Sequence, residues 1–236
     1  TTLLLLRQSV PLGAQRWARL AGLLALPGNP DALPPVVPVD LGAAINQGYL
    51  DQVEDIAPQR LVDRHDELDA LTRFCAGTDA YQWWQAGPWF GKTALASWLV
   101  LHPPAGVRVV CFFITGRLAG QSDHTSFTRA LVEQLAVLTG ETDILSANLT
   151  DWDGQRIRLL KKAAKQATDA GERLLLVVDG LDEDRGAPPA GPTSVASLLP
   201  RRPPPGLRVL LTSRPHSGIS LDVHPDHPLR DCTIHQ

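Results

Sequence analysis

Short apolar runs alternate with amphipathic segments along most of the chain after residue 60. One run, VRVVCFFIT, is almost unbroken and rich in β-branched and aromatic residues, which is typical of a strand buried on both faces. Further strands are predicted at YQWWQA, RLLLVVD, LRVLLTS and DCTIHQ. Strands that alternate with helices imply a parallel sheet joined by right-handed crossovers, so the pattern predicts an α/β fold.

The segments before and between these strands carry apolar residues at helical spacing. They predict helices at residues 61–75, 92–101, 124–140 and 151–171. The first of these helices has acidic residues near its start, which suits the positive end of the helix dipole. Gly171 is expected to close the last one, because glycine tolerates the left-handed backbone that commonly ends a helix.

The first 40 residues follow a different pattern. Apolar residues at helical spacing predict a helix over residues 13–26, which we expect to pack on a core rather than to bind a membrane. Prolines stop it within residues 27–40, because proline lacks an N–H and fixes φ. We therefore predict that residues 1–40 form a strand or helix with a proline-rich linker, as the tail of an upstream domain, and that residues 41–236 form the α/β domain.

The initial stretch TTLLLLRQSV is too short for a membrane span and lacks the cleavage site of a secretory signal. The chain has no methionine, even at position 1, so we expect it to be a piece of a longer protein. We expect no association with a membrane.

Composition narrows the possible partners and the compartment. The formal net charge is -3, so bulk attraction to nucleic acid is not expected. The three cysteines, Cys75, Cys111 and Cys232, lie far apart without a metal or redox spacing. Such spacing favours buried thiols in a reducing compartment and predicts a cytoplasmic protein.

Residues 86–93, AGPWFGKT, match the Walker A pattern G-x-x-x-x-G-K-[ST] except at the first position, where Ala86 replaces glycine. In such loops backbone N–H groups curl around phosphate oxygens, aided by the field of the following helix. Lys92 is expected to neutralise β- and γ-phosphate oxygens, and the Thr93 hydroxyl to bind Mg²⁺. The predicted nucleotide-binding residues of the loop are Gly87, Pro88, Trp89, Phe90, Gly91, Lys92, Thr93 and Ala94.

Two later strands end in polar residues that support a nucleotide site. A run of apolar residues leads to Asp179, the form of a Walker B strand whose carboxylate holds Mg²⁺. Asp182 or Glu183 is expected to orient or deprotonate the attacking water, and Arg214 to contact the γ-phosphate. Each feature alone has a plain alternative, namely a glycine–lysine turn, a solvated acidic loop or a surface arginine. Their occurrence in this order favours a nucleotide site.

These residues resemble the STAND class of signalling P-loop NTPases, and within it the NACHT-like domains of bacterial multidomain proteins, notably actinobacterial ones. The resemblance rests on AGPWFGKTAL, LLLVVDGLDED and VLLTSRP and covers about residues 58–236. It implies a five-stranded parallel sheet of order 5-1-4-3-2, flanked by helices. The strands would lie at 81–86, 107–115, 173–179, 207–213 and 231–235. It also implies downstream helical and winged-helix parts that this chain would lack.

The segment LVDRHDEL, residues 61–68, looks like the element that precedes the phosphate loop in this class and lines its adenine pocket. Asp63 takes the place of the usual glycine, whereas Arg64 keeps the arginine. The resemblance therefore implies that Val62 and Arg64 contact the nucleotide.

The function implied by the resemblance is a regulatory ATPase. It would bind Mg-ATP or ADP, hydrolyse ATP slowly, and act as a conformational or oligomerisation switch in a longer signalling or antiphage-defence protein. Its partners would be the nucleotide, further copies of itself or other domains of the same protein. A nucleotide-binding scaffold without significant turnover is the alternative. A GTPase or a small-molecule kinase is less favoured, because neither an [NT]KxD sequence nor an acceptor-binding lid is recognisable.

Overall fold

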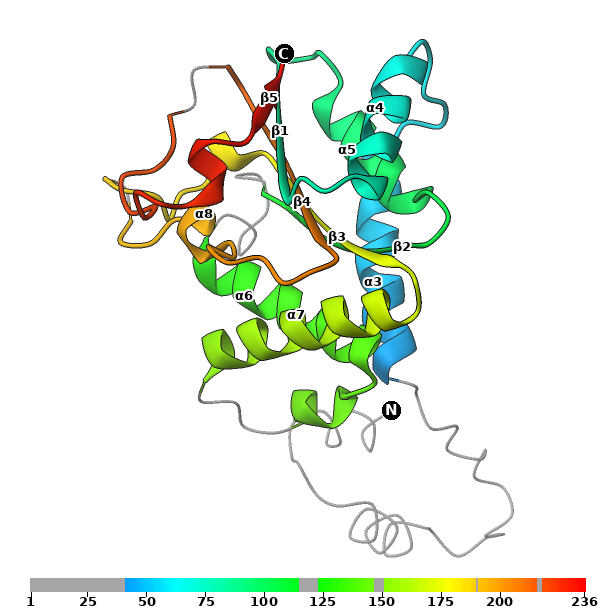
Figure 1. The fold of residues 1–236 in the computed structure, drawn as a ribbon, viewed down its shortest axis with the longest axis vertical. Coiled ribbons are helices and arrows are strands. Elements are labelled where there is room, and N and C mark those ends of the chain that lie inside the picture. Colours follow the sequence, from blue (N-terminus) through cyan, green and yellow to red (C-terminus); the bar gives the residue numbers. More distant parts are fainter. Residues whose placement is uncertain (1–40, 115–122, 147–150, 190, 216–217) are drawn as a thin grey trace, which may run out of the picture. The chain divides into compact units, whose positions relative to one another are not determined.

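The computed structural model describes residues 41–114, 123–146, 151–189, 191–215 and 218–236. The helix predicted at 13–26 and the linker predicted at 27–40 lie outside these residues. Within residues 41–236, helices cover both faces of a central sheet (Figure 1). None of the described helices is long and apolar enough to cross a membrane.

The sheet has five parallel strands in the order β2-β3-β4-β1-β5. Read from the other edge, this is the predicted order 5-1-4-3-2, so the predicted α/β P-loop NTPase fold is confirmed. The first, second and fifth strands are shorter than predicted. The strand bounds are β1 Tyr81–Gln85, β2 Val107–Phe113, β3 Arg173–Asp179, β4 Leu207–Ser213 and β5 Thr233–His235.

Strand β3 shows why the central apolar run is unbroken. Leu174, Leu176 and Val178 face one hydrophobic core, whereas Leu175 and Val177 face a second core. All five side chains are fully buried. A strand covered on both faces needs apolar residues at every position, so the alternation expected of a one-sided strand is absent here.

The two cores belong to two sets of helices, which Figure 1 shows around the strands. Helices α6, α7 and α8 cover one face, and α4 and α5 the other. The helix bounds are α3 Leu41–Ile56, α4 His65–Ala76, α5 Lys92–Leu101, α6 His124–Thr139, α7 Trp152–Asp169 and α8 Val195–Leu198. Short 3-10 turns lie at Thr142–Ser146, Leu181–Glu183 and Pro228–Arg230.

The four predicted helices are present, but the first begins at His65 rather than at residue 61. The helix starts later because Asp63 has a left-handed φ of 55° and Arg64 has non-helical backbone angles. Gly171 has a left-handed φ of 73° two residues after the end of α7, as expected of a closing glycine.

Helix α3 was not predicted. It packs against α5 and α6. Tyr49, Val53 and Ile56 recur at the spacing of one helix face, a helical signal that the prediction missed. Packing on two neighbouring helices stabilises α3.

Candidate functional site

The phosphate-loop segment lies between the end of β1 at Gln85 and the start of α5 at Lys92. Ala86 still belongs to the sheet edge, since its N–H donates to the Ser213 carbonyl at 3.2 Å. The tight approach falls one residue later, because a Cβ on Gly87 would lie 3.2 Å from the Phe90 ring. Gly87 thus leaves room for the Phe90 ring.

Lys92 lies inside the curve of this loop. Its Nζ donates to the carbonyl of Ala86 at 2.6 Å and to that of Gly87 at 3.0 Å. Gly91 before it has a φ of 83°, which glycine adopts without strain. An ammonium held by two neutral carbonyls can exchange them for phosphate oxygens, which bind it more strongly.

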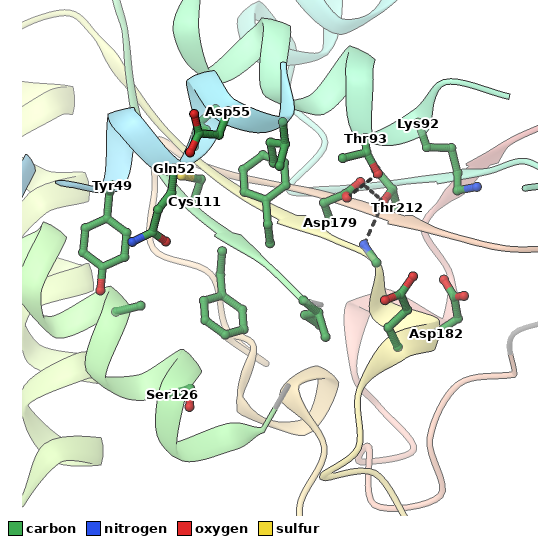
Figure 2. A pocket seen from close by; sticks show the side chains of 18 of the residues that line it. Tyr49, Gln52, Asp55, Lys92, Thr93, Cys111, Ser126, Asp179, Asp182 and Thr212 are labelled. Carbon is green, nitrogen blue, oxygen red and sulfur yellow. Dashed lines mark hydrogen bonds between the residues drawn. The ribbon is translucent and has the colours of Figure 1, made fainter. Parts of the chain in front are cut away.

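Asp179 ends β3 and is buried beside the start of α5 (Figure 2). One carboxylate oxygen accepts the Thr93 hydroxyl at 2.7 Å, and the other accepts the Thr212 hydroxyl at 2.5 Å. Burial raises the pKa of Asp179, while these two hydrogen bonds and the charge of Lys92 act in the opposite direction. A cation at this position would stabilise the ionised carboxylate.

Thr212 is a site residue that was not predicted from the sequence. Val178 pairs with Leu211 in the β3–β4 register, which brings the next residues, Asp179 and Thr212, side by side. The Thr212 hydroxyl also accepts the Gly180 N–H at 3.0 Å. Its position at the end of the strand next to β3 was the signal that could have identified it.

The donor set at Thr93 and Asp179 fits Mg²⁺. A hydroxyl and a carboxylate are the oxygen ligands that this ion prefers, and it commonly completes its shell with water and substrate phosphates. Among the described residues no group of three histidines, cysteines or carboxylates is placed to hold a metal ion. Phosphate oxygens and water would therefore supply the remaining ligands.

The acidic turn after β3 faces Arg214, which follows β4. Asp182 accepts the Arg214 N–H at 2.9 Å, and its other oxygen lies 3.3 Å from the Arg214 Nε. The Arg214 Nη2 lies 3.7 Å from a Glu183 oxygen. The structure thus brings together all three residues predicted to act on water and on the γ-phosphate, and joins them as ion pairs.

Val62 and Arg64, the residues expected to contact the nucleotide, lie apart from the cavity beside Lys92. Arg64 lies against the outside of the loop, where its Nη2 donates to the Phe90 carbonyl at 2.9 Å and its Nη1 pairs with Glu67 at 2.5 Å. Val62 is 63% exposed. Neither Val62 nor Arg64 is among the residues that line the cavity beside Lys92.

A cavity of about 1520 Å³ runs from the phosphate-loop segment past Asp179 to the C-terminal end of β2. Figure 2 shows side chains of α3 across the cavity from Thr93 and Asp179. The Tyr49 hydroxyl of α3 donates to Glu133 of α6 at 2.8 Å, which ties the two walls together. The α3 wall, lined by Tyr49, Gln52 and Asp55, was not predicted, because α3 itself was not predicted. The other wall belongs to the predicted helix α6, whose lining side chains include Ser126, Arg129 and Glu133.

Two of the solved structures that match this chain have low similarity to it. The Aeropyrum pernix ORC2 protein, solved as ADPNP-ADP complexes, is 18% identical over 67% of this chain and 43% of that chain, with a TM-score of 0.38. Drosophila ORC bound to AT-rich DNA and Cdc6 is 18% identical over 80% of this chain and 51% of that chain, with a TM-score of 0.33. The chain thus spans about half the length of these proteins.

The comparison with curated proteins gave no match. A family model described as Nephrocystin 3, N-terminal matches residues 68–214, from the middle of α4 to the arginine after β4. This range is more than half of the chain and includes the loop, Asp179 and Arg214. The chain therefore belongs to the nephrocystin 3 N-terminal family.

Proposed function

We propose that residues 41–236 form an ATP-binding regulatory NTPase module, a NACHT-like domain of the STAND class. It binds Mg-ATP and hydrolyses it slowly, as a conformational or oligomerisation switch in a longer signalling or defence protein. The observation that carries the proposal is the Lys92 ammonium inside the loop, next to the Thr93–Asp179 hydrogen bond. Its cytoplasmic location rests on the cysteine spacing, and its self-association and its contacts with other domains rest on the sequence resemblance.

The roles follow from the contacts in the site. The N–H groups of Gly87 and of residues 89–93, together with the Lys92 ammonium, hold the phosphates, while Thr93 and Asp179 hold the metal. Mg²⁺ would neutralise charge on the β- and γ-phosphate oxygens. Asp182, with Glu183 next to it, positions water for attack on the γ-phosphate. Arg214, which pairs with both carboxylates, responds to the γ-phosphate by exchanging a carboxylate for it.

One observation favours the second candidate function, a nucleotide-binding scaffold without turnover. Arg214 contacts both acidic side chains, and Asp182 is held at two atoms of that arginine. Both Asp182 oxygens face N–H groups of Arg214, so the carboxylate has less room to accept a hydrogen bond from an attacking water. Turnover therefore requires Arg214 to move away from Asp182 when the γ-phosphate is present.

Turnover is tested with Asp182→Asn and Glu183→Gln, which keep the side-chain shape. The Asp182 variant, or the Glu183 variant if that residue is the base, is expected to lower phosphate release about 100-fold. Affinity for Mg-ATP should stay within about threefold of the unaltered protein, because neither side chain holds the metal or the loop. Phosphate release at saturating Mg-ATP and calorimetric titration measure the two quantities.

Asp169→Asn, on the exposed side of α7, is the matched control and should change neither quantity. Phosphate release at the unaltered rate in both site variants would contradict the assignment of the base. If the unaltered protein binds Mg-ATP but releases no phosphate even at high protein concentration, the protein is a nucleotide-binding scaffold rather than an ATPase switch.

A further inference from the structure

Trp89 has an unusual backbone for its residue type. Its φ is 70°, and Asp63 is the other non-glycine residue with positive φ in the described part of the chain. Bulky side chains rarely occupy the left-handed region, which glycine enters without cost. The indole is 97% exposed, so it contributes almost no packing to the protein itself. A costly backbone conformation without a packing reward indicates a functional role for this position.

The strain coincides with a contact that fixes the loop from outside. Asp63 and Trp89 precede Arg64 and Phe90 respectively, and Arg64 donates to the Phe90 carbonyl at 2.9 Å. Glu67 holds the other end of the guanidinium. These contacts over-determine the loop, which is the condition under which a strained residue persists.

The Trp89 indole lines the same cavity as the residues proposed to hold the phosphates. Pro88 and Trp89 line it together with Lys92, Thr93 and Asp179. The neighbouring Phe90 ring instead lies over Gly87, 3.2 Å from where a Cβ would be. Trp89 therefore presents an uncovered aromatic face three residues from the lysine that holds phosphate.

We propose that the Trp89 side chain packs against the nucleoside part of the bound nucleotide and makes the site select nucleoside triphosphates over inorganic polyphosphates. This inference rests on the proposed function. Aromatic side chains stack on any base, because every base has a π-face. A nucleoside is favoured over a second copy of the chain because it is covalently joined to the phosphates that the adjacent amides hold.

The test compares Mg-ATP with Mg-tripolyphosphate on the full chain by calorimetric titration. The unaltered protein is expected to bind Mg-ATP at least tenfold more tightly than Mg-tripolyphosphate. Trp89→Gly, which also relieves the left-handed strain, should lower that ratio about tenfold while leaving the affinity for Mg-tripolyphosphate within about twofold. Trp89→Phe should keep most of the ratio, because it keeps an aromatic face.

Leu221→Gly is the matched control, since Leu221 is 89% exposed and does not line the cavity. It should leave the ratio unchanged. A Trp89→Gly protein that keeps the ratio of the unaltered protein overturns the inference. The inference is also overturned if Trp89→Gly changes only the oligomeric state in light scattering, which would make Trp89 a contact between copies. If the unaltered protein binds neither ligand, the proposed function fails first and the inference fails with it.

Discussion

Replacing Asp179 by alanine is expected to remove the benefit of Mg²⁺ for nucleotide binding, with a loss of about 100-fold in affinity for Mg-ATP. The carboxylate is buried and is fixed by the hydroxyls of Thr93 and Thr212. Removing it deletes a metal ligand and releases the side chain of the other ligand, Thr93. Titrations of ATP with Mg²⁺ and with a chelator measure the effect, and the chelated titration should change by less than about threefold.

Asp179→Asn separates charge from packing. The amide keeps the shape and can still form hydrogen bonds with both threonine hydroxyls, so the alanine cavity is avoided. In Asp179→Asn, Mg²⁺ should still no longer increase the affinity for ATP. The melting temperature without ligand should not fall, because burial raises the pKa of Asp179 and thus disfavours its ionised form. Equal affinity of Asp179→Asn and the unaltered protein for Mg-ATP would contradict the assignment of Asp179 as a metal ligand.

Gly180→Ala is expected to destabilise the domain by about 2–4 kcal/mol. Gly180 has a φ of 79°, and an added Cβ would lie 2.8 Å from the Ile114 carbonyl oxygen, a backbone atom that cannot rotate away. Its N–H also donates to Thr212, so a shifted backbone would disturb the partner of Asp179. Urea unfolding measures the loss of stability.

Gly140→Ala is the control for the backbone conformation alone. Gly140 has a φ of 73°, and an added Cβ would meet no atom within 4 Å. It should cost about 1 kcal/mol, the usual penalty of the left-handed region for a residue with a Cβ. If Gly180→Ala lowers the free energy of unfolding no more than Gly140→Ala does, the close approach of Gly180 to Ile114 does not contribute to the cost of the substitution.

The strand order was implied by the resemblance, whereas the convergence of the polar strand ends could be predicted from the strands themselves. Strand β3 is apolar from Leu174 to Val178 and ends in Asp179, and Arg214 directly follows β4. Parallel strands present their carboxyl ends at one edge of the sheet. The loop before Lys92 was recognisable despite Ala86, because Gly91, Lys92 and Thr93 match the Walker A pattern.

Other parts of the site depend on tertiary contacts that a local pattern does not encode. The Tyr49–Glu133 hydrogen bond follows from the packing of α3 against α6. The contact of Thr212 with Asp179 follows from the β3–β4 register. The contact of Arg64 with the Phe90 carbonyl joins residues 26 positions apart, and a motif comparison could not reveal it.

The most direct test of the site is the affinity of Lys92→Ala for Mg-ATP, measured by calorimetric titration beside the unaltered protein. Lys161→Ala, on the exposed side of α7, controls for the loss of one positive charge. We expect a loss of about tenfold to a hundredfold for Lys92→Ala, because charge-assisted hydrogen bonds to phosphate are removed. We expect no change for Lys161→Ala. Equal affinities of the Lys92 variant and the unaltered protein, at the same Mg²⁺ concentration, would contradict a phosphate site at this loop.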